Sequence, residues 1–129
     1  MMNLTESTGA GEKLQSISIQ RGQKVMSLMD GLEPTKEMVS FLKGLSPMIM
    51  QNGLGQTIAF MQSKRDKHGQ LLAVLEKVMS ASNGLMDKIL NAEINEYPIM
   101  QKEAIEYAGW MKKFALASYK EKSNEPAAS

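Results

Sequence analysis

The chain has 129 residues, the size of a single domain built around one hydrophobic core. It contains no cysteine, which excludes disulfides, thiolate nucleophiles and cysteine-ligated zinc or iron–sulfur sites. Fifteen Lys and Arg against fourteen Asp and Glu give a formal net charge of +1, so any affinity for nucleic acid must come from clustered charge.

The N-terminal sequence MMNLTESTGAGEK has neither a basic segment nor an apolar segment of the kind found in signal peptides. No apolar run reaches the roughly 18 residues that a membrane helix needs. The absence of cysteine fits a reducing compartment. We therefore expect a cytoplasmic protein with no membrane partner.

Both ends of the chain are small, polar and aperiodic, which predicts flexible tails at residues 1–12 and 121–129 around a folded domain at residues 13–120. Within this domain, apolar residues recur at intervals of three and four, as one face of a helix requires. No stretch shows the strict alternation of a strand. The sequence predicts an all-α fold, a compact single-domain helical bundle of about five to six helices.

The first two helices are predicted from their apolar stripes. One stripe begins at Val25 and ends at Leu32, and a second covers residues 38–45. Gly31 and Pro34 are expected to close the first helix and to open the second.

Ser46 followed by Pro47 has the form of an N-cap with proline at the first helical position, which predicts that a third helix begins there, nearly continuous with the second. A further stripe covers residues 71–79. The pair Asn83-Gly84 then breaks the pattern, and a short stripe follows at residues 85–90.

The last helix is predicted to open at Pro98 and to be the longest. Trp110 and Phe114 lie beside its apolar stripe, where packing is their expected role and a base-stacking platform is the alternative. The stripe itself consists of Met100, Ala104, Tyr107, Ala108, Met111 and Ala115.

The sequence offers little that could support catalysis. The only histidine, His68, lies in the polar stretch SKRDKHG, where we expect a solvated loop. There is no G-x-S-x-G nucleophile elbow and no phosphate-binding loop. Glu93 and Glu96, the one acidic pair that suggests a nuclease, have ordinary helix-surface spacing. We expect no catalytic residues, no metal, no cofactor and no small-molecule substrate.

Two blocks carry a resemblance to a known family. GLSPMIMQNGLGQTIAFMQSK (residues 44–64) resembles the central signature of the small, all-helical subunit of the type III-B CRISPR effector, the fifth protein of the Cmr set, whose members read L-P-x-x-I-x-x-N-G-L-G-x-T-L-A-F. EAIEYAGWMKKFALA (residues 103–117) resembles the closing helix of that family. QRGQKV resembles its opening helix, with Gly22 where alanine is usual. The similarity spans residues 14–119.

This resemblance implies a non-catalytic subunit of an RNA-guided, RNA-targeting complex in which other subunits cleave. Its implied role is to brace the filament and to line the path of the guide–target duplex. The implied partners are other Cmr subunits, including the backbone subunit, neighbouring copies of this chain, the guide RNA and the target RNA.

The resemblance also bears on the N-G-L-G segment. We interpret Gly53 and Gly55 as permitting close helix packing near the start of the third helix, with Asn52 or Thr57 available to satisfy free amide groups. A phosphate contact at residues 52–57 remains the alternative.

Basic side chains are the candidates for RNA contact, since phosphates are recognised by charge and shape. The densest cluster is at residues 64–67, where the alternative is a solvated helix end whose cations complement the negative end of the helix dipole. The RNA-binding candidates are Arg21, Lys43, Lys64, Arg65, Lys67, Lys112 and Lys113.

A second class of function stays open. A helical protein-interaction adaptor with no direct nucleic-acid contact would have the same stripes and tails. The two hypotheses differ in whether Lys64, Arg65 and Lys112 lie on one face of the molecule.

Overall fold

The structure, a computed structural model, describes residues 10–123, and the side chains of residues 17–120. Within that range it has six helices and no strand, which confirms the predicted all-α fold. The first helix begins before the predicted domain start at residue 13 and the last ends beyond residue 120; the remaining parts of the predicted tails lie outside the described residues. The helices are α2 (Ala10–Met29), α3 (Lys36–Asn52), α4 (Leu54–Ser63), α5 (Arg65–Val78), α6 (Leu85–Leu90) and α7 (Tyr97–Ser123).

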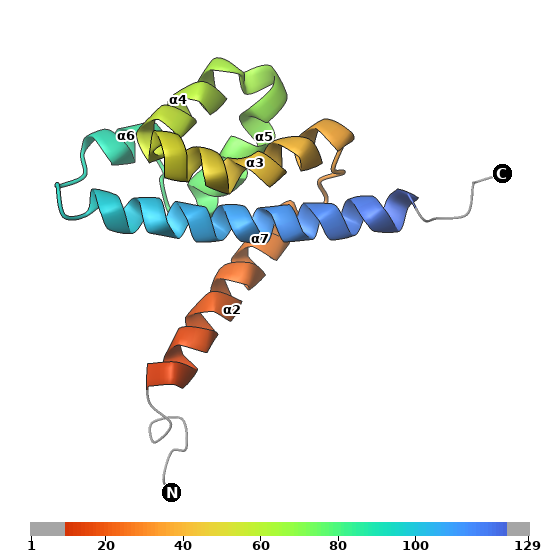
Figure 1. Cartoon of the computed structure of the whole chain (residues 1–129), viewed down its shortest axis with the longest axis horizontal. Coiled ribbons are helices and arrows are strands. Elements are labelled where there is room, and N and C mark those ends of the chain that lie inside the picture. Colours follow the sequence, from red (N-terminus) through yellow and green to blue (C-terminus); the bar gives the residue numbers. More distant parts are fainter. Residues whose placement is uncertain (1–9, 124–129) are drawn as a thin grey trace, which may run out of the picture.

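Helix α7 runs along the whole body, as Figure 1 shows, with α3 antiparallel beside it and α2 crossing it near its middle. Helices α4 and α5 pack above and behind α3, where α5 also contacts α2 and α7, and α6 lies beside α4. The first half of α2 projects away from the body. None of the helices between residues 10 and 123 has the length and apolar character needed to cross a membrane.

The core follows the predicted periodicity. Every residue of the predicted α7 stripe is buried, and Ala104 and Ala108 are completely inaccessible. Their small side chains let neighbouring helices approach α7 closely. Leu42, Leu45 and Ile49 of α3 are buried in the same core.

Trp110 packs between α7 and α2. Its indole lies against the backbone of Gly22, where an added Cβ would come within 2.9 Å of the ring. The ring also stacks on Phe114, with 5.6 Å between centroids, and the Lys113 ammonium lies 5.3 Å from its centre. Trp110 is half-buried, so it joins two helices rather than filling the middle of the core.

The predicted helix start at Ser46-Pro47 is wrong. Helix α3 continues through Pro47 to Asn52. Leu45 and Ile49 are both fully buried on either side of the proline, and their packing outweighs the backbone hydrogen bond that proline cannot make. The Ser46 hydroxyl donates to the Ile105 carbonyl of α7 at 3.2 Å instead of capping a helix.

The break comes at Gly53, which ends α3 and precedes α4. Its φ of 86° and ψ of 157° belong to a region that is essentially restricted to glycine. The Leu54 amide donates to Gln101 Oε1 at 2.9 Å and the Gly55 amide donates to the Tyr97 hydroxyl at 3.0 Å.

These contacts correct the expected capping of α4. Side chains of α7, and not Asn52 or Thr57, accept from the first amides of this helix. The Thr57 hydroxyl donates to the Gly53 carbonyl at 2.9 Å. The Leu54 and Gly55 amides therefore already have partners, and a phosphate would have to displace them.

Replacing Gly53 with alanine should lower the free energy of unfolding by about 1–3 kcal/mol, because alanine rarely adopts this backbone conformation. Its Cβ would also lie 3.4 Å from the Tyr97 hydroxyl. Gly44→Ala is the matched control: nothing lies within 4 Å of a Cβ at position 44, inside α3, so this change should stabilise by about 0.4–1 kcal/mol. Urea unfolding measures both. Equal effects of the two variants would contradict the assigned role of Gly53.

Trp110→Ala should lower the free energy of unfolding by about 2–3 kcal/mol, somewhat below the roughly 3–5 kcal/mol of a fully buried aromatic, since part of the indole is exposed. Ile94, which is 95% exposed, provides the control Ile94→Ala, expected to change stability by less than about 0.5 kcal/mol. An unchanged denaturation midpoint for Trp110→Ala would assign the indole to a partner-binding or base-stacking role.

Candidate nucleic-acid interface

Three cations gather where α4 passes into α5. Lys64 is the single residue between the two helices, Arg65 is the first residue of α5, and Lys67 follows within its first turn. All three are exposed. We call these three residues the basic junction.

Helix electrostatics explain only part of the basic junction. Lys64 follows the C-terminal end of α4, where a cation is favourable, as expected for a solvated helix end. Arg65 and Lys67 instead occupy the N-terminal turn of α5, where the helix dipole disfavours positive charge. Asp66 in the same turn offsets some of this cost. Helix stability therefore does not account for two of the three cations.

The cations of the basic junction are also unpaired. Among residues 17–120, no ion pair within 4 Å includes Lys64, Arg65 or Lys67. Their charges face solvent and remain available to an anionic partner.

His68 does not lie in a solvated loop, as expected from the sequence, but in α5. Its imidazole stacks on Phe41 of α3, with 3.8 Å between centroids and 17° between planes, and lies 5.8 Å from the Phe60 ring of α4. The three rings join three helices and attach the basic junction to α3.

Burial lowers the pKa of His68 below its ordinary value, and Lys67 acts in the same direction. Asp66 and Glu37 oppose this shift and Lys64 adds to it. The neutral form of the imidazole therefore predominates at pH 7, so the cationic charge of this region comes from the basic junction.

Arg21 lies apart from the basic junction and already has partners. Its guanidinium forms an ion pair with Glu106 and lies 3.7 Å from a carboxylate oxygen of Glu103, both on α7. It also lies 5.9 Å from the centre of the Tyr107 ring. Sequence reasoning missed these partners because they come from the far end of the chain, and they reduce the charge that Arg21 can offer to RNA.

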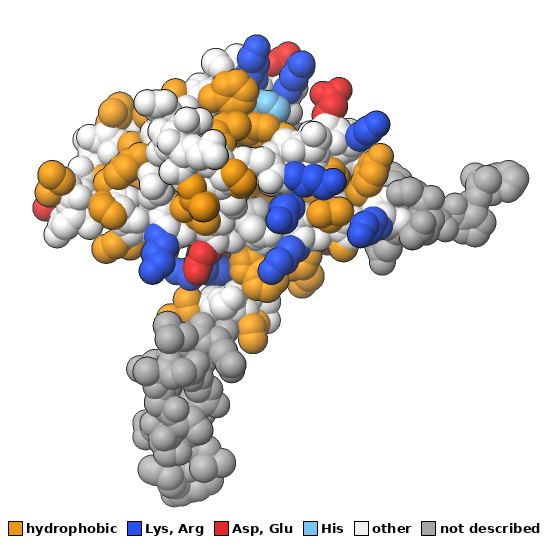
Figure 2. Space-filling view, in the orientation of Figure 1, with side chains coloured by type: hydrophobic (Ala, Val, Ile, Leu, Met, Phe, Trp, Pro, Cys, Tyr) orange, Lys and Arg blue, Asp and Glu red, His pale blue; other side chains and the backbone are white. Residues whose placement is uncertain are grey.

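The remaining candidates lie on α3 and α7. Lys43 and Lys113 are exposed, while Lys112 is half-buried. Figure 2 shows basic side chains in two places on one face: at the top edge, where α4 meets α5, and lower down, along α3 and α7. Lys43, Lys112 and Lys113 thus belong to other helices than the basic junction.

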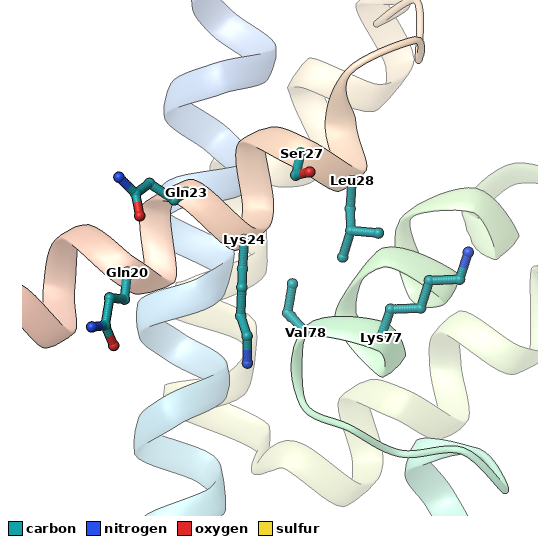
Figure 3. A pocket seen from close by; sticks show the side chains of 7 residues that line it. All are labelled: Gln20, Gln23, Lys24, Ser27, Leu28, Lys77 and Val78. Atoms are coloured by element: carbon teal, nitrogen blue, oxygen red, sulfur yellow. The ribbon is translucent and has the colours of Figure 1, made fainter.

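A hollow of about 560 Å³ lies between α2 and α5 (Figure 3). Leu28 and Val78 lie across from each other in it, Lys24 reaches along one wall, and the end of Lys77 turns away. Sequence reasoning did not single out these two lysines, because the crossing of α2 over the bundle brings together segments that are distant in the sequence.

Residues that could hold a metal ion do not cluster anywhere in the described part of the chain: no group of three or more His, Asp or Glu side chains converges there. Glu96 accepts a hydrogen bond from the Glu93 amide at 2.8 Å, a local turn interaction. These two glutamates are thus engaged in turn geometry.

The fold and the basic junction describe a small helical protein with unpaired surface cations. Comparison with known proteins narrows this class. The family model for the CRISPR-associated protein Cas_Cmr5 matches residues 17–118, and the chain belongs to that family.

Two relatives support this assignment. The CRISPR system Cmr subunit Cmr5 of Thermotoga maritima is 28% identical over 107 residues, covering 78% of this chain and 83% of the relative. A crystal structure of a CRISPR-associated Cmr5 family protein from Thermus thermophilus aligns with a TM-score of 0.64 and 25% identity, covering 81% of this chain and 97% of the other. The resemblance noted in the sequence is confirmed.

The lowered pKa of His68 predicts a measurable pH dependence. The unfolded chain takes up this proton at a higher pH than the folded chain, so the free energy of unfolding should fall as the pH drops below about 6.5. An NMR titration of the imidazole should give a midpoint below 6.5. His68→Gln should remove this part of the pH dependence. A midpoint at or above 6.5 would show that the ring is not desolvated.

Proposed function

We propose that this protein is a non-catalytic subunit of a type III-B Cmr ribonucleoprotein complex in the cytoplasm, where it braces the filament and lines the path of the guide and target RNA. Membership of the Cas_Cmr5 family supports the assembly, since a relative of similar length is named a Cmr subunit. Catalysis, cofactors and small-molecule substrates have no part in the proposed role.

The basic junction is the observation that carries the RNA contact. It places three exposed, unpaired cations at one point, two of them at a helix end that disfavours positive charge. A phosphate backbone would compensate this local cost. Because phosphates carry no sequence information, such a contact suits a complex in which base pairing with a guide selects the target.

Lys43, Lys112 and Lys113 form the second proposed RNA-contacting area, along α3 and α7. Arg21 is the weakest of the candidates, since Glu103 and Glu106 already neutralise it. Figure 2 shows basic side chains both at the top edge and lower on the same face, and an extended strand or duplex could touch both places where a small anion could touch only one.

Exposed apolar side chains support the proposed contacts with the backbone subunit and with neighbouring copies. Ile17 and Ile19 lie exposed on the projecting part of α2, and Leu90, Ile94 and Ile99 lie exposed around the turn between α6 and α7. Such side chains are typical of surfaces that become covered on assembly. An adaptor that touches only protein would use these surfaces alone, and the basic junction favours the RNA-contacting role over it.

Lys64→Ala combined with Arg65→Ala should leave the fold and the assembly intact but weaken retention of target RNA by the whole complex. The loss should be similar for unrelated guide sequences, and the salt slope of binding should fall by about one for each phosphate contact removed per copy. Filter binding over a range of salt concentrations measures both.

Lys24→Ala combined with Lys77→Ala removes the same charge from the hollow between α2 and α5 and is the matched control, expected to bind as wild type. If the Lys64/Arg65 variant retains target RNA as tightly as wild type with the same slope, the basic junction is only a solvated surface. If alanine variants of Lys43, Lys112 and Lys113 also retain target RNA as tightly as wild type, the adaptor role would replace this proposal.

A further inference from the structure

Three aromatic rings sit directly beside the basic junction. Phe41, Phe60 and His68, which we call the ring cluster, come from α3, α4 and α5. Phe41 and His68 are stacked face to face, and the Phe60 ring lies nearly parallel to Phe41, at 23°, with 6.4 Å between centroids. Phe41 is therefore aligned with both other rings, while Phe60 and His68 are tilted by 36° to each other.

The ring cluster reaches the surface. Phe60 is 40% exposed, whereas Leu54, Ile58 and Met61 of the same helix are completely buried. Figure 2 shows the histidine at the surface with apolar side chains next to it, just below the basic side chains of the top edge. Packing alone would account for Phe41 and His68 but gives no reason to leave a large aromatic ring open to water.

A hollow of about 290 Å³ is lined in part by His68 and by Lys67 of the basic junction. Thr35, Glu37, Asp66 and Gln70 line it and supply side-chain oxygens. Such oxygens accept hydrogen bonds from the exocyclic amino groups of nucleobases. The hollow thus places hydrogen-bond acceptors beside the His68 ring and a cation of the basic junction, groups that match the base and the phosphate of a nucleotide.

We propose that the ring cluster is a stacking site for an unpaired base of single-stranded RNA, with Phe60 as the outer ring and the basic junction holding the flanking phosphates. The inference rests on the proposed RNA contact and goes beyond it by naming the form of RNA that this end of the molecule recognises. Aromatic side chains beside a positively charged groove are the general means of binding single strands, because every base has a π face.

A duplex would not satisfy this site. Bases inside an A-form helix are covered on both faces by their neighbours, and only unstacked bases can lie on an aromatic side chain. The neutral state of His68 at pH 7 suits stacking as well, since a charged imidazole would repel Lys64 and Lys67.

The test compares two probes on the full-length protein: a single-stranded oligouridylate and a blunt RNA duplex of equal phosphate number. Phe60→Leu keeps an apolar side chain but removes the ring. It should weaken single-strand binding by about 5- to 150-fold, the range for losing one stacked base, and change duplex binding and the salt slope little. Phe60→Trp should restore single-strand binding.

Phe114→Leu is the matched control, because it removes a ring from the other aromatic pair, on α7. It should bind both probes as wild type. Denaturation midpoints check that each variant is folded. If Phe60→Leu does not fold, wild-type NMR decides: ring protons of Phe60 and His68 should shift upfield with the oligouridylate and not with the duplex.

The outcomes separate the two proposals. If Lys64→Ala with Arg65→Ala weakens both probes and lowers the salt slope, while Phe60→Leu binds the single strand as wild type, the stacking site is overturned and the phosphate contact stands. If neither variant changes binding, both fail. Equal losses of single strand and duplex in Phe60→Leu would also overturn stacking, since the ring would then only position the basic junction.

Discussion

Burial of the apolar face of α7 against α3 and α2 is the interaction on which the rest of the molecule depends. Ala104 and Ala108 let the neighbouring helices come close, and Ser46 fixes α3 along α7 through the Ile105 carbonyl. Helix α3 in turn presents Phe41 to the rings of α4 and α5. The basic junction, although far from α7, is therefore held in place through a chain of contacts that begins there.

Much of this fold could be predicted from local patterns. The α7 stripe and the break at Gly84 follow from periodicity and from the backbone freedom of glycine, both of which are properties of neighbouring residues. The wrong predictions concern contacts between residues that are distant in the sequence. Ser46-Pro47 has the form of a helix start, but packing of Leu45 and Ile49 overrides it, and the partners of the α4 amides come from a helix that follows much later in the sequence.

The candidate site shows the same division. Lys64, Arg65 and Lys67 lie within four consecutive residues, so their grouping could be predicted without a fold. Which end of a helix they occupy could not, because the expected loop around His68 is in fact the first turns of α5. The rings that surround His68 come from two other helices, and the acidic partners of Arg21 come from α7. Periodicity within one segment contains no information about these contacts between different helices.

The hydrogen bonds between the start of α4 and side chains of α7 have a consequence for folding during synthesis. The acceptors for the Leu54 and Gly55 amides lie 47 and 42 residues further along the chain, on α7. The buried faces of α2 and α3 also pack on α7. During synthesis from the N-terminus, the parts of these faces that pack on α7 stay uncovered until α7 has left the ribosome. The core can therefore close only after α7 has been made, and a product that stops short of α7 lacks the element that covers these faces.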